Sequence, residues 1–185
     1  MRSPTRCSWV GSDPLLVAYH DEEWGVPELD SRALWEALVL GGFQAGLSWR
    51  TVLCKRDAFR AAFEGFDPYV VAGYGPLDVE RLMRDPGIIR SQPKILGAIE
   101  NARAYVTMEE AGEDLASLVW SACSGPVLLE GTPELATAVA DALRDRGFAF
   151  IGPVVVHAWL RAAGAVYEHE PGCFRTDGVN ALRPR

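Results

Sequence analysis

Apolar residues recur at the three- and four-residue spacing of amphipathic helices along nearly the whole chain, and this pattern limits the possible folds most. Asp30 or Ser31 is a candidate N-cap for one helix and Ser48 for a second, with the Gly41-Gly42 pair expected to separate them. The apolar positions of these two helices are Leu34, Trp35, Leu38 and Val39, then Trp49, Val52, Leu53, Phe59 and Phe63. This part of the chain is therefore predicted to be helical.

The rest of the chain continues this pattern. A helical stripe stops at Pro86-Gly87 and resumes beyond it, which predicts a helix, a hairpin and a second helix. Thr132-Pro133 is a typical N-cap with proline at the first helical position, and Gly147 is a typical C-terminal stop. Segment 148–156 is rich in β-branched residues, but the sequence offers no second convincing strand, so we expect a turn and a buried helix there. The predicted fold class is all-α.

Length and charge narrow the function classes. A chain of 185 residues forms one domain, and the formal net charge of −7 argues against a partner held by bulk positive charge, nucleic acid included. Residues 84–103 differ, with four basic and two acidic side chains, a net charge of +2. No apolar run approaches the roughly 20 residues of a membrane helix, and residues 1–9 contain no apolar signal segment, so a cytoplasmic location is expected.

Cysteine and histidine occur in pairs near both ends of the chain. Cys7 and His20 lie near the start, and His169 and Cys173 near the end. Two thiolates and two imidazoles fill the four tetrahedral positions of Zn²⁺, which indicates a structural site without an open position for catalysis. Small buried cysteines and surface histidines would give the same residues, and the spacing alone does not decide between the two interpretations.

Aromatic side chains are concentrated in the first 50 residues. They lie beside a glycine-rich turn, and such a cluster forms either a hydrophobic core or the wall of a pocket that stacks on a flat ligand such as a nucleobase. The residues are Trp9, Tyr19, Trp24, Trp35 and Trp49. For any single tryptophan, the core is the more common role.

The hairpin between residues 86 and 94 is a candidate phosphate site. Gly87 permits a tight turn with exposed N–H groups, and Arg90 and Lys94 flank it. Backbone amides at a helix start with nearby cations can hold a DNA backbone without reading its sequence. A plain turn between two helices, with a solvated basic edge, explains the same residues.

Several collinear segments together resemble the type I 3-methyladenine DNA glycosylases, a family of helix-hairpin-helix base-excision repair enzymes. The resemblance covers almost the whole chain, and its most specific blocks are His20-Asp21-Glu22-Glu23-Trp24-Gly25-Val26-Pro27 and Gln44-Ala45-Gly46-Leu47-Ser48-Trp49. Further matching segments are Arg6–Val10, Phe66-Asp67-Pro68, Gly87–Arg90, Asn101–Tyr105, Arg146-Gly147-Phe148, and His169 with Cys173.

This resemblance implies a fold, a metal and a DNA substrate. The implied fold has two helical lobes, a hairpin lobe of about 30–125 and a terminal lobe of 1–30 and 126–185, with a structural zinc held by Cys7, His20, His169 and Cys173. It implies a monomer that flips the damaged nucleotide out of double-stranded DNA. The aromatic pocket would contain Trp9, Tyr19 and Trp49, Gly46 and Leu47 would wedge the duplex, and Gly87, Arg90 and Lys94 would contact the backbone.

The implied reaction needs little acid or base chemistry. An N3-alkylated adenine already carries positive charge and leaves readily, and a cage of aromatic rings favours a cationic base by about 0.5–2 kcal/mol per contact. The family works without an assisting aspartate, so no general acid, general base or lyase residue is assigned.

One departure from the family concerns the pocket. The family carries Leu-Glu-Gly before the second block, whereas this chain has Leu40-Gly41-Gly42, so the carboxylate that would bond the adenine edge is missing. Such a contact is worth about 1–3 kcal/mol of discrimination. Gly41 and the neighbouring Phe43 are candidate pocket residues. Either the pocket is widened for a bulkier cationic alkylpurine, or the chain is a weakly active or non-catalytic damage-binding paralogue.

Other departures concern DNA contacts and one histidine. The family's lysine-rich run is Arg144-Asp145-Arg146 here, and Ala149 follows Phe148 where lysine is usual. His157 replaces a tyrosine and is either a pocket residue or a satisfied core histidine, and its apolar neighbours favour the second interpretation. Few phosphate contacts imply weak non-specific DNA affinity and a shallow salt dependence.

Overall fold

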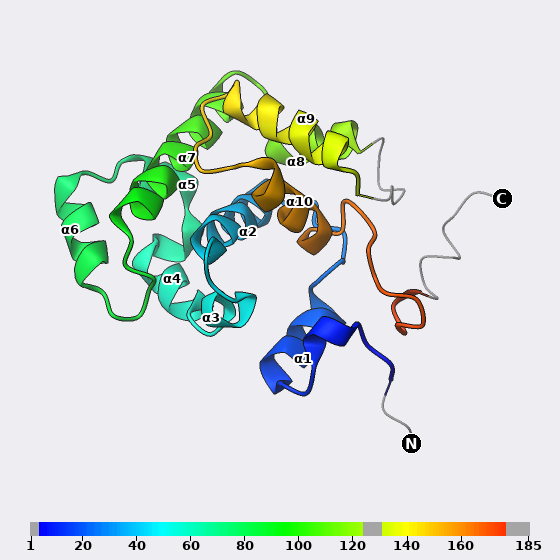
Figure 1. Ribbon diagram of the computed structural model, residues 1–185. Helices are drawn as coiled ribbons and strands as arrows, with labels where there is room; N and C mark the ends of the chain where they lie inside the picture. Colours follow the sequence, from blue (N-terminus) through cyan, green and yellow to red (C-terminus); the bar gives the residue numbers. More distant parts are fainter. Residues whose placement is uncertain (1–3, 124–130, 177–185) are drawn as a thin grey trace.

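The computed structural model describes residues 4–123 and 131–176, and within those ranges all regular elements are helical (Figure 1). The expected lobe boundary at 125–126 lies outside them, so the division into lobes stays a prediction. No described helix is long and apolar enough to cross a membrane. The helices are α1 (Pro14–Glu22), α2 (Ser31–Gln44), α3 (Trp49–Leu53), α4 (Arg56–Ala62), α5 (Pro68–Ala72), α6 (Pro76–Arg84), α7 (Gln92–Glu110), α8 (Leu115–Ala122), α9 (Pro133–Arg144) and α10 (Pro153–Ala162), with short 3-10 helices η1 (Ser8–Val10) and η2 (Glu64–Phe66).

The predicted N-caps are confirmed. A carboxylate oxygen of Asp30 accepts a hydrogen bond from the Ala33 N–H at 2.8 Å, and the Ser48 hydroxyl oxygen accepts one from Thr51 at 3.2 Å. Thr132 caps α9 in the same way. These side chains satisfy amide groups that the first turn of a helix leaves unpaired, so their effect is local.

The expected helix break at Gly41-Gly42 is wrong, because α2 continues through both glycines to Gln44. Each glycine costs about 1 kcal/mol in a helix interior. The next residue, Phe43, is 1% exposed, with its ring centroid 4.7 Å from that of Phe59. Burying a phenyl side chain contributes about 1.5–3 kcal/mol, which offsets the cost and holds the last turn of α2 in place. The helix expected after Ser48 is instead divided into α3 and α4.

The main hydrophobic core surrounds α2. Helices α7, α8 and α10 contact α2 directly, and the indole N–H of Trp159 on α10 donates to the Leu34 carbonyl at 2.9 Å. The turn and buried helix expected over 148–156 are confirmed, since Ile151 is buried and α10 begins at Pro153. Helix α10 thus forms a wall beside α2 (Figure 1).

A smaller apolar cluster joins the two ends of the described chain. In Figure 1, η1 and α1 lie beside the turn near the end of the chain, and the Phe174 N–H donates to the Thr5 carbonyl at 2.9 Å. The cluster consists of Cys7, Val10, Tyr19, Trp24, Leu53 and Cys173. Residues more than 150 positions apart in sequence therefore share one environment.

The predicted helix, hairpin and helix correspond to α6, residues 85–91 and α7. The turn is held from within, because the Gly87 N–H donates to Asp85 Oδ1 at 2.7 Å and Lys55 Nζ donates to the carbonyls of Pro86 and Gly87. A Cβ at Gly87 would lie 3.0 Å from the Ala58 Cβ, so close packing is what favours glycine here. The N–H of Gly87 is therefore occupied within the turn, and the contact of this hairpin with a DNA backbone stays a prediction.

Candidate functional site

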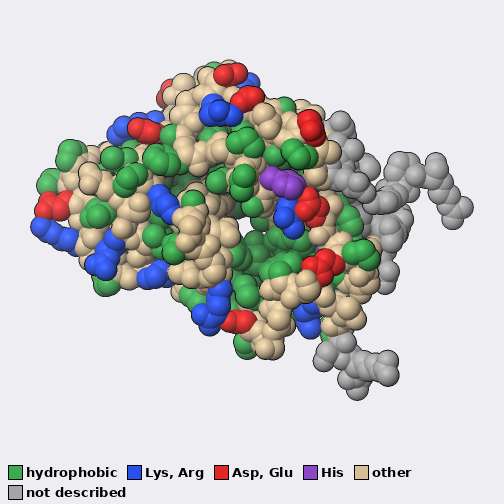
Figure 2. All heavy atoms as spheres, viewed as in Figure 1, with side chains coloured by type: hydrophobic (Ala, Val, Ile, Leu, Met, Phe, Trp, Pro, Cys, Tyr) green, Lys and Arg blue, Asp and Glu red, His purple; other side chains and the backbone are tan. Residues whose placement is uncertain are grey.

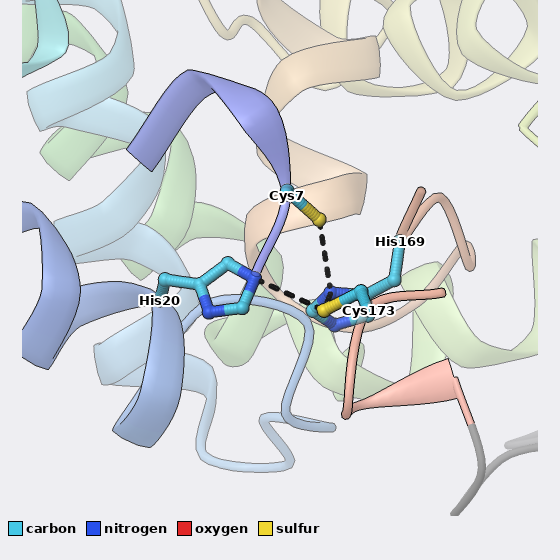
Figure 3. Close-up of side chains that lie close together, drawn as sticks. All are labelled: Cys7, His20, His169 and Cys173. Atoms are coloured by element: carbon cyan, nitrogen blue, oxygen red, sulfur yellow. Dashed lines mark hydrogen bonds between the residues drawn. The ribbon is translucent and has the colours of Figure 1, made fainter. Parts of the chain in front are cut away.

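Four buried side chains meet where the two ends of the described chain come together (Figure 3). The ligand atoms of Cys7, His20, His169 and Cys173 all lie within 4.8 Å of one another. Cys7 Sγ is 3.5 Å from His169 Nδ1, and Cys173 Sγ is 3.5 Å from His20 Nε2 and 3.7 Å from His169 Nδ1. The predicted juxtaposition of the four residues is confirmed.

These distances suit a tetrahedral metal. Bond lengths of about 2.3 Å to sulfur and about 2.05 Å to nitrogen place the two donor atoms about 3.6 Å apart at a tetrahedral angle. The second nitrogen of His20, Nδ1, is 2.9 Å from Asp21 Oδ1, and Arg6 holds that carboxylate in turn. A carboxylate on the outer nitrogen of a ligating histidine fixes its orientation and raises its basicity.

Ionisation in the cluster reflects its burial. Burial lowers the pKa of His169 to about 4, which keeps the imidazole neutral as metal binding requires. Burial raises the pKa of the Cys7 thiol to about 11. A metal cation would have to displace that thiol proton, so binding would release protons.

A pocket opens between α1, α2, α3 and α10. It has a volume of about 540 Å³, within the range of about 300–1,000 Å³ typical of small-molecule sites. Helix α2 contributes small residues one turn apart, Ala33, Ala37 and Gly41, which leave the hollow beside it. Figure 2 shows a depression lined by hydrophobic side chains at this place.

Aromatic rings form one wall of the pocket. Trp9, Tyr19, Trp24 and Trp49 all line it. The Tyr19 and Trp49 ring centroids are 5.4 Å apart, and Trp9 meets Trp24 edge to face at 5.1 Å. Burial raises the pKa of Tyr19, so its hydroxyl stays protonated. The indole N–H of Trp49 is buried and has no hydrogen-bond partner among the described residues.

Charged groups around the pocket are mostly paired. Arg56 bonds Glu23 and Arg60 bonds Glu36, the latter at 2.8 Å, and all four residues line the cavity. Arg161 lies over the Trp24 ring at 5.7 Å, with its Nε 2.7 Å from the Glu168 carboxylate. The full set of charged lining residues is Glu22, Glu23, Glu28, Glu36, Arg56, Arg60 and Arg161. Carboxylates thus outnumber guanidinium groups, which favours a cationic ligand.

Gly41 lines the pocket and has room for a side chain. A Cβ there would have one neighbour within 4 Å, Val155 Cγ1 at 3.8 Å, which is ordinary van der Waals contact. Neither packing nor a left-handed backbone requires glycine at this position. The missing carboxylate is therefore a change in the chemistry of the pocket.

Phe43 is not part of this pocket. It follows Gly41 by two residues, about 200° around the helix, so its ring packs in the main core against Phe59 and Phe63. The sequence did not decide whether Trp35 belongs to the core or to a pocket. In the structure Trp35 is fully buried in that core.

The expected DNA-contacting residues lie at the end of α2 and on the hairpin. Gly46 has φ +81° and Leu47 is 42% exposed, so the turn after α2 presents an apolar side chain to solvent. Arg90 is exposed and has no ion-pair partner in the described part of the chain. Lys94 differs, because its Nζ donates to the carbonyls of Phe43 and Ala45 at 3.0 and 2.7 Å. Its ammonium supports the turn after α2.

Comparison with known proteins gives these features a context. Residues 9–176 match the family model described as methyladenine glycosylase. The chain belongs to the methyladenine glycosylase family. It is 48% identical over 177 residues to DNA-3-methyladenine glycosylase 1 of Escherichia coli (strain K12), which covers 91% of this chain and 95% of that protein.

Solved structures support the same family assignment. A crystal structure of 3-methyladenine DNA glycosylase I superposes with a TM-score of 0.88 at 48% identity, covering 92% of this chain and 98% of that one. A tyrosine-to-phenylalanine variant of 3-methyladenine DNA glycosylase I, solved in complex with 3-methyladenine, has a TM-score of 0.84 at 34% identity, covering 91% of this chain and 96% of that one.

Sequence reasoning missed several residues that line this pocket. Glu36 and Gln44 share the pocket face of α2 with Gly41, and helical spacing would have grouped them if α2 had been expected to continue. Arg161 and Trp159 come from α10, which no sequence pattern linked to the aromatic cluster. His157 is half-exposed and bonds Glu168 at 2.8 Å, so its interpretation as a core histidine is wrong, although its ring nitrogen is satisfied.

Proposed function

We propose that this protein is a DNA glycosylase of base-excision repair that hydrolyses the N-glycosidic bond of N3-alkylated adenine or a related cationic alkylpurine. The observation that carries the proposal is the aromatic pocket with its excess of carboxylates, found in a chain of this family. Aromatic faces and nearby carboxylates both favour a positively charged flat base over a neutral one.

The substrate base would be flipped out of double-stranded DNA to reach the pocket. Bases within the duplex are stacked, and extrusion costs a few kcal/mol. Leu47, exposed at the turn after α2, would fill the vacated space, and Gly46 lets that turn form in a left-handed conformation. Arg90 would contact a phosphate beside the site.

The chemical step breaks the bond between C1′ of the deoxyribose and the purine nitrogen. The bonding electron pair leaves with the cationic base, which departs neutral, while water adds to C1′ and releases a proton to solvent. The protein contributes by binding the base between Trp9, Tyr19 and Trp49, which line the pocket. No side chain is assigned as acid or base, and no lyase step is proposed.

Gly41 is proposed to alter the preference among lesions. Without a carboxylate at this position the pocket loses one contact to the base edge and gains space, so we expect weaker selection of 3-methyladenine and acceptance of bulkier cationic purines. Arg56 and Arg60 already bond the nearby carboxylates of Glu23 and Glu36. These two glutamates are therefore poor substitutes for the missing one.

Zinc is proposed as a structural cofactor. Cys7, His20, His169 and Cys173 would hold it, and with four protein ligands it would stabilise the junction of the two chain ends without joining the reaction. A monomeric state and a cytoplasmic location stay predictions of the sequence.

The deciding experiment measures base release from two duplexes, one methylated and one carrying a bulky N3- or N7-alkylpurine. We expect free base from both, and an abasic strand that stays intact until it is treated with alkali. Binding of both duplexes without any released base would contradict the proposal and identify a damage-binding protein instead.

A further inference from the structure

Phe150 is an exposed aromatic residue in an unusual backbone conformation. Its φ is +56°, in the left-handed region that side chains other than glycine rarely adopt. Its side chain is 56% exposed, whereas Phe148 and Ile151 on either side are both 3% exposed. The backbone thus directs the phenyl ring of Phe150 to the surface, although Phe148 and Ile151 are buried.

Two contacts with α7 hold this conformation. The buried Asn101 side chain accepts a hydrogen bond from the Ala149 N–H at 2.6 Å, immediately before Phe150. The phenyl ring lies over Gly97, where a Cβ would come 2.3 Å from Phe150 Cδ2. The ring therefore occupies a fixed place that depends on a glycine beneath it. Strained residues maintained in this way occur preferentially at functional sites.

The ring also lies beside the last turn of α2. Phe150, Gly42, Phe43 and Lys94 surround a gap of only about 10 Å³, too small to hold more than one water molecule. Lys94 bonds the carbonyls of Phe43 and Ala45, which directly precede Gly46 and Leu47. Lys94 therefore connects the gap beside Phe150 to the segment that leads into the exposed Leu47.

We propose that Phe150 is a second DNA-contacting residue, whose ring packs on the base stack beside the position vacated by the flipped nucleotide. This inference rests on the proposed function, because it assigns Phe150 to the surface where Leu47 would enter the duplex. Phe150 does not line the pocket that would receive the base. Its contribution therefore goes to DNA binding and nucleotide extrusion, without contact to the reacting bond.

An aromatic ring suits this role because flipping removes stacking from the neighbouring bases. Every base has a flat face, so stacking on a phenyl ring is independent of sequence and is effective without positive charge. This surface has few free cations, since Lys94 is occupied by backbone carbonyls. Apolar contact would therefore carry a larger share of the affinity for DNA than in a strongly basic protein.

The test compares Phe150→Ala with Tyr69→Ala, a control that removes an aromatic ring of similar exposure, 59%, from α5. Tyr69 contacts Glu109 near the C-terminal end of α7, which is roughly 18 Å of helix from the Gly97 that Phe150 covers. We expect Phe150→Ala to weaken binding to a duplex with a stable abasic-site analogue at least fivefold. The affinity of Tyr69→Ala for this duplex should stay within twofold of that of the original protein. The affinity of Phe150→Ala for free 3-methyladenine should also stay within twofold of the original value.

Replacement by another aromatic residue separates stacking from folding. Phe150→Tyr should restore duplex binding to within twofold, because the flat face remains. The inference would be overturned if the Phe150→Ala variant bound the duplex with the affinity of the original protein. It would also be overturned if this variant lost duplex binding and free-base binding to the same extent. If the original protein releases no base, the proposed function fails, but a selective loss of duplex binding in Phe150→Ala would still support the DNA contact.

Discussion

Gly25 leaves the space that the His169 imidazole occupies, since a Cβ at Gly25 would lie 2.7 Å from His169 Nε2. Gly25 also has φ +75°, so glycine is favoured there both by its backbone conformation and by the contact. The glycine of the most specific sequence block thus sets the position of a proposed metal ligand far away in the chain.

Gly25→Ala should therefore destabilise the protein and lower its zinc content. The left-handed conformation costs alanine about 1–2 kcal/mol, and displacing the imidazole adds about 1–3 kcal/mol of overpacking. Gly112→Ala is the matched control, because Gly112 has φ +78° and nothing within 4 Å of its Cβ position. Urea denaturation and metal analysis measure both effects. Equal losses of stability in the two variants would show that the contact with His169 is unimportant.

Zinc binding is tested with two of the four cysteines of the chain, Cys7 and Cys123. Purified protein should contain one zinc per chain, and Cys7→Ala should lose it together with several kcal/mol of stability, because metal binding is coupled to folding. Cys123→Ala is the control, since Cys123 is equally buried but lies in the main core away from the cluster. Metal analysis that finds zinc retained in Cys7→Ala, or absent from the original protein, would contradict the proposal.

The metal-free protein should lose stability in acid. The pKa of His169 is lowered by burial to about 4, below its ordinary value of 6.5, so the folded state disfavours the proton that the unfolded state accepts. The contribution of the neutral His169 ring to the free energy of unfolding is fully present above about pH 6.5, and it is lost as the pH falls through about 4. Denaturation of chelator-treated protein between pH 7 and pH 4 measures this change, and His169→Gln should reduce it. An unchanged pH dependence in His169→Gln would exclude His169 as its source.

Local signals in the sequence are sufficient for the helix starts but not for the metal cluster. Asp30, Ser48 and Thr132 each bond an amide within three residues, so their role can be read from the immediate sequence. The four Cys and His residues were recognisable by their chemistry alone. What spacing left open was whether the two pairs meet, because that depends on packing between the chain ends.

Predictions failed where tertiary contacts decide the outcome. The pair Gly41-Gly42 stays helical because Phe43 is buried against α4, and continuing the helix in turn places Phe43 on the opposite side from the pocket. The local net charge of 84–103 suggested a basic DNA-binding edge. Lys94 and Arg103 instead bond backbone carbonyls of other segments, and Arg84 pairs with Glu80, which leaves Arg90.

Gly41→Glu should shift the preference among lesions. The new carboxylate would extend from a Cβ position with one distant neighbour, so it should enter the pocket without disturbing the fold. A contact of about 1–3 kcal/mol predicts about a 5- to 150-fold rise in the ratio of 3-methyladenine release to bulky-purine release. Gly41→Ala is the control, because it adds helix propensity without an acceptor. Single-turnover base release that is equal in all three proteins would refute a widened pocket.

Arg90 should account for much of the salt dependence of DNA binding. It is exposed and free of ion pairs in the described residues, so a phosphate contact would release about one counterion, and Arg90→Ala should reduce the slope of log K against log salt by about 0.9. Binding should weaken equally for all sequences, because phosphates carry no base identity. Arg84→Ala is the control, since Arg84 lies at the end of α6 just before the hairpin and already pairs with Glu80. Titration of an undamaged duplex at several salt concentrations gives both slopes, and a slope unchanged by Arg90→Ala would place the phosphate contact elsewhere.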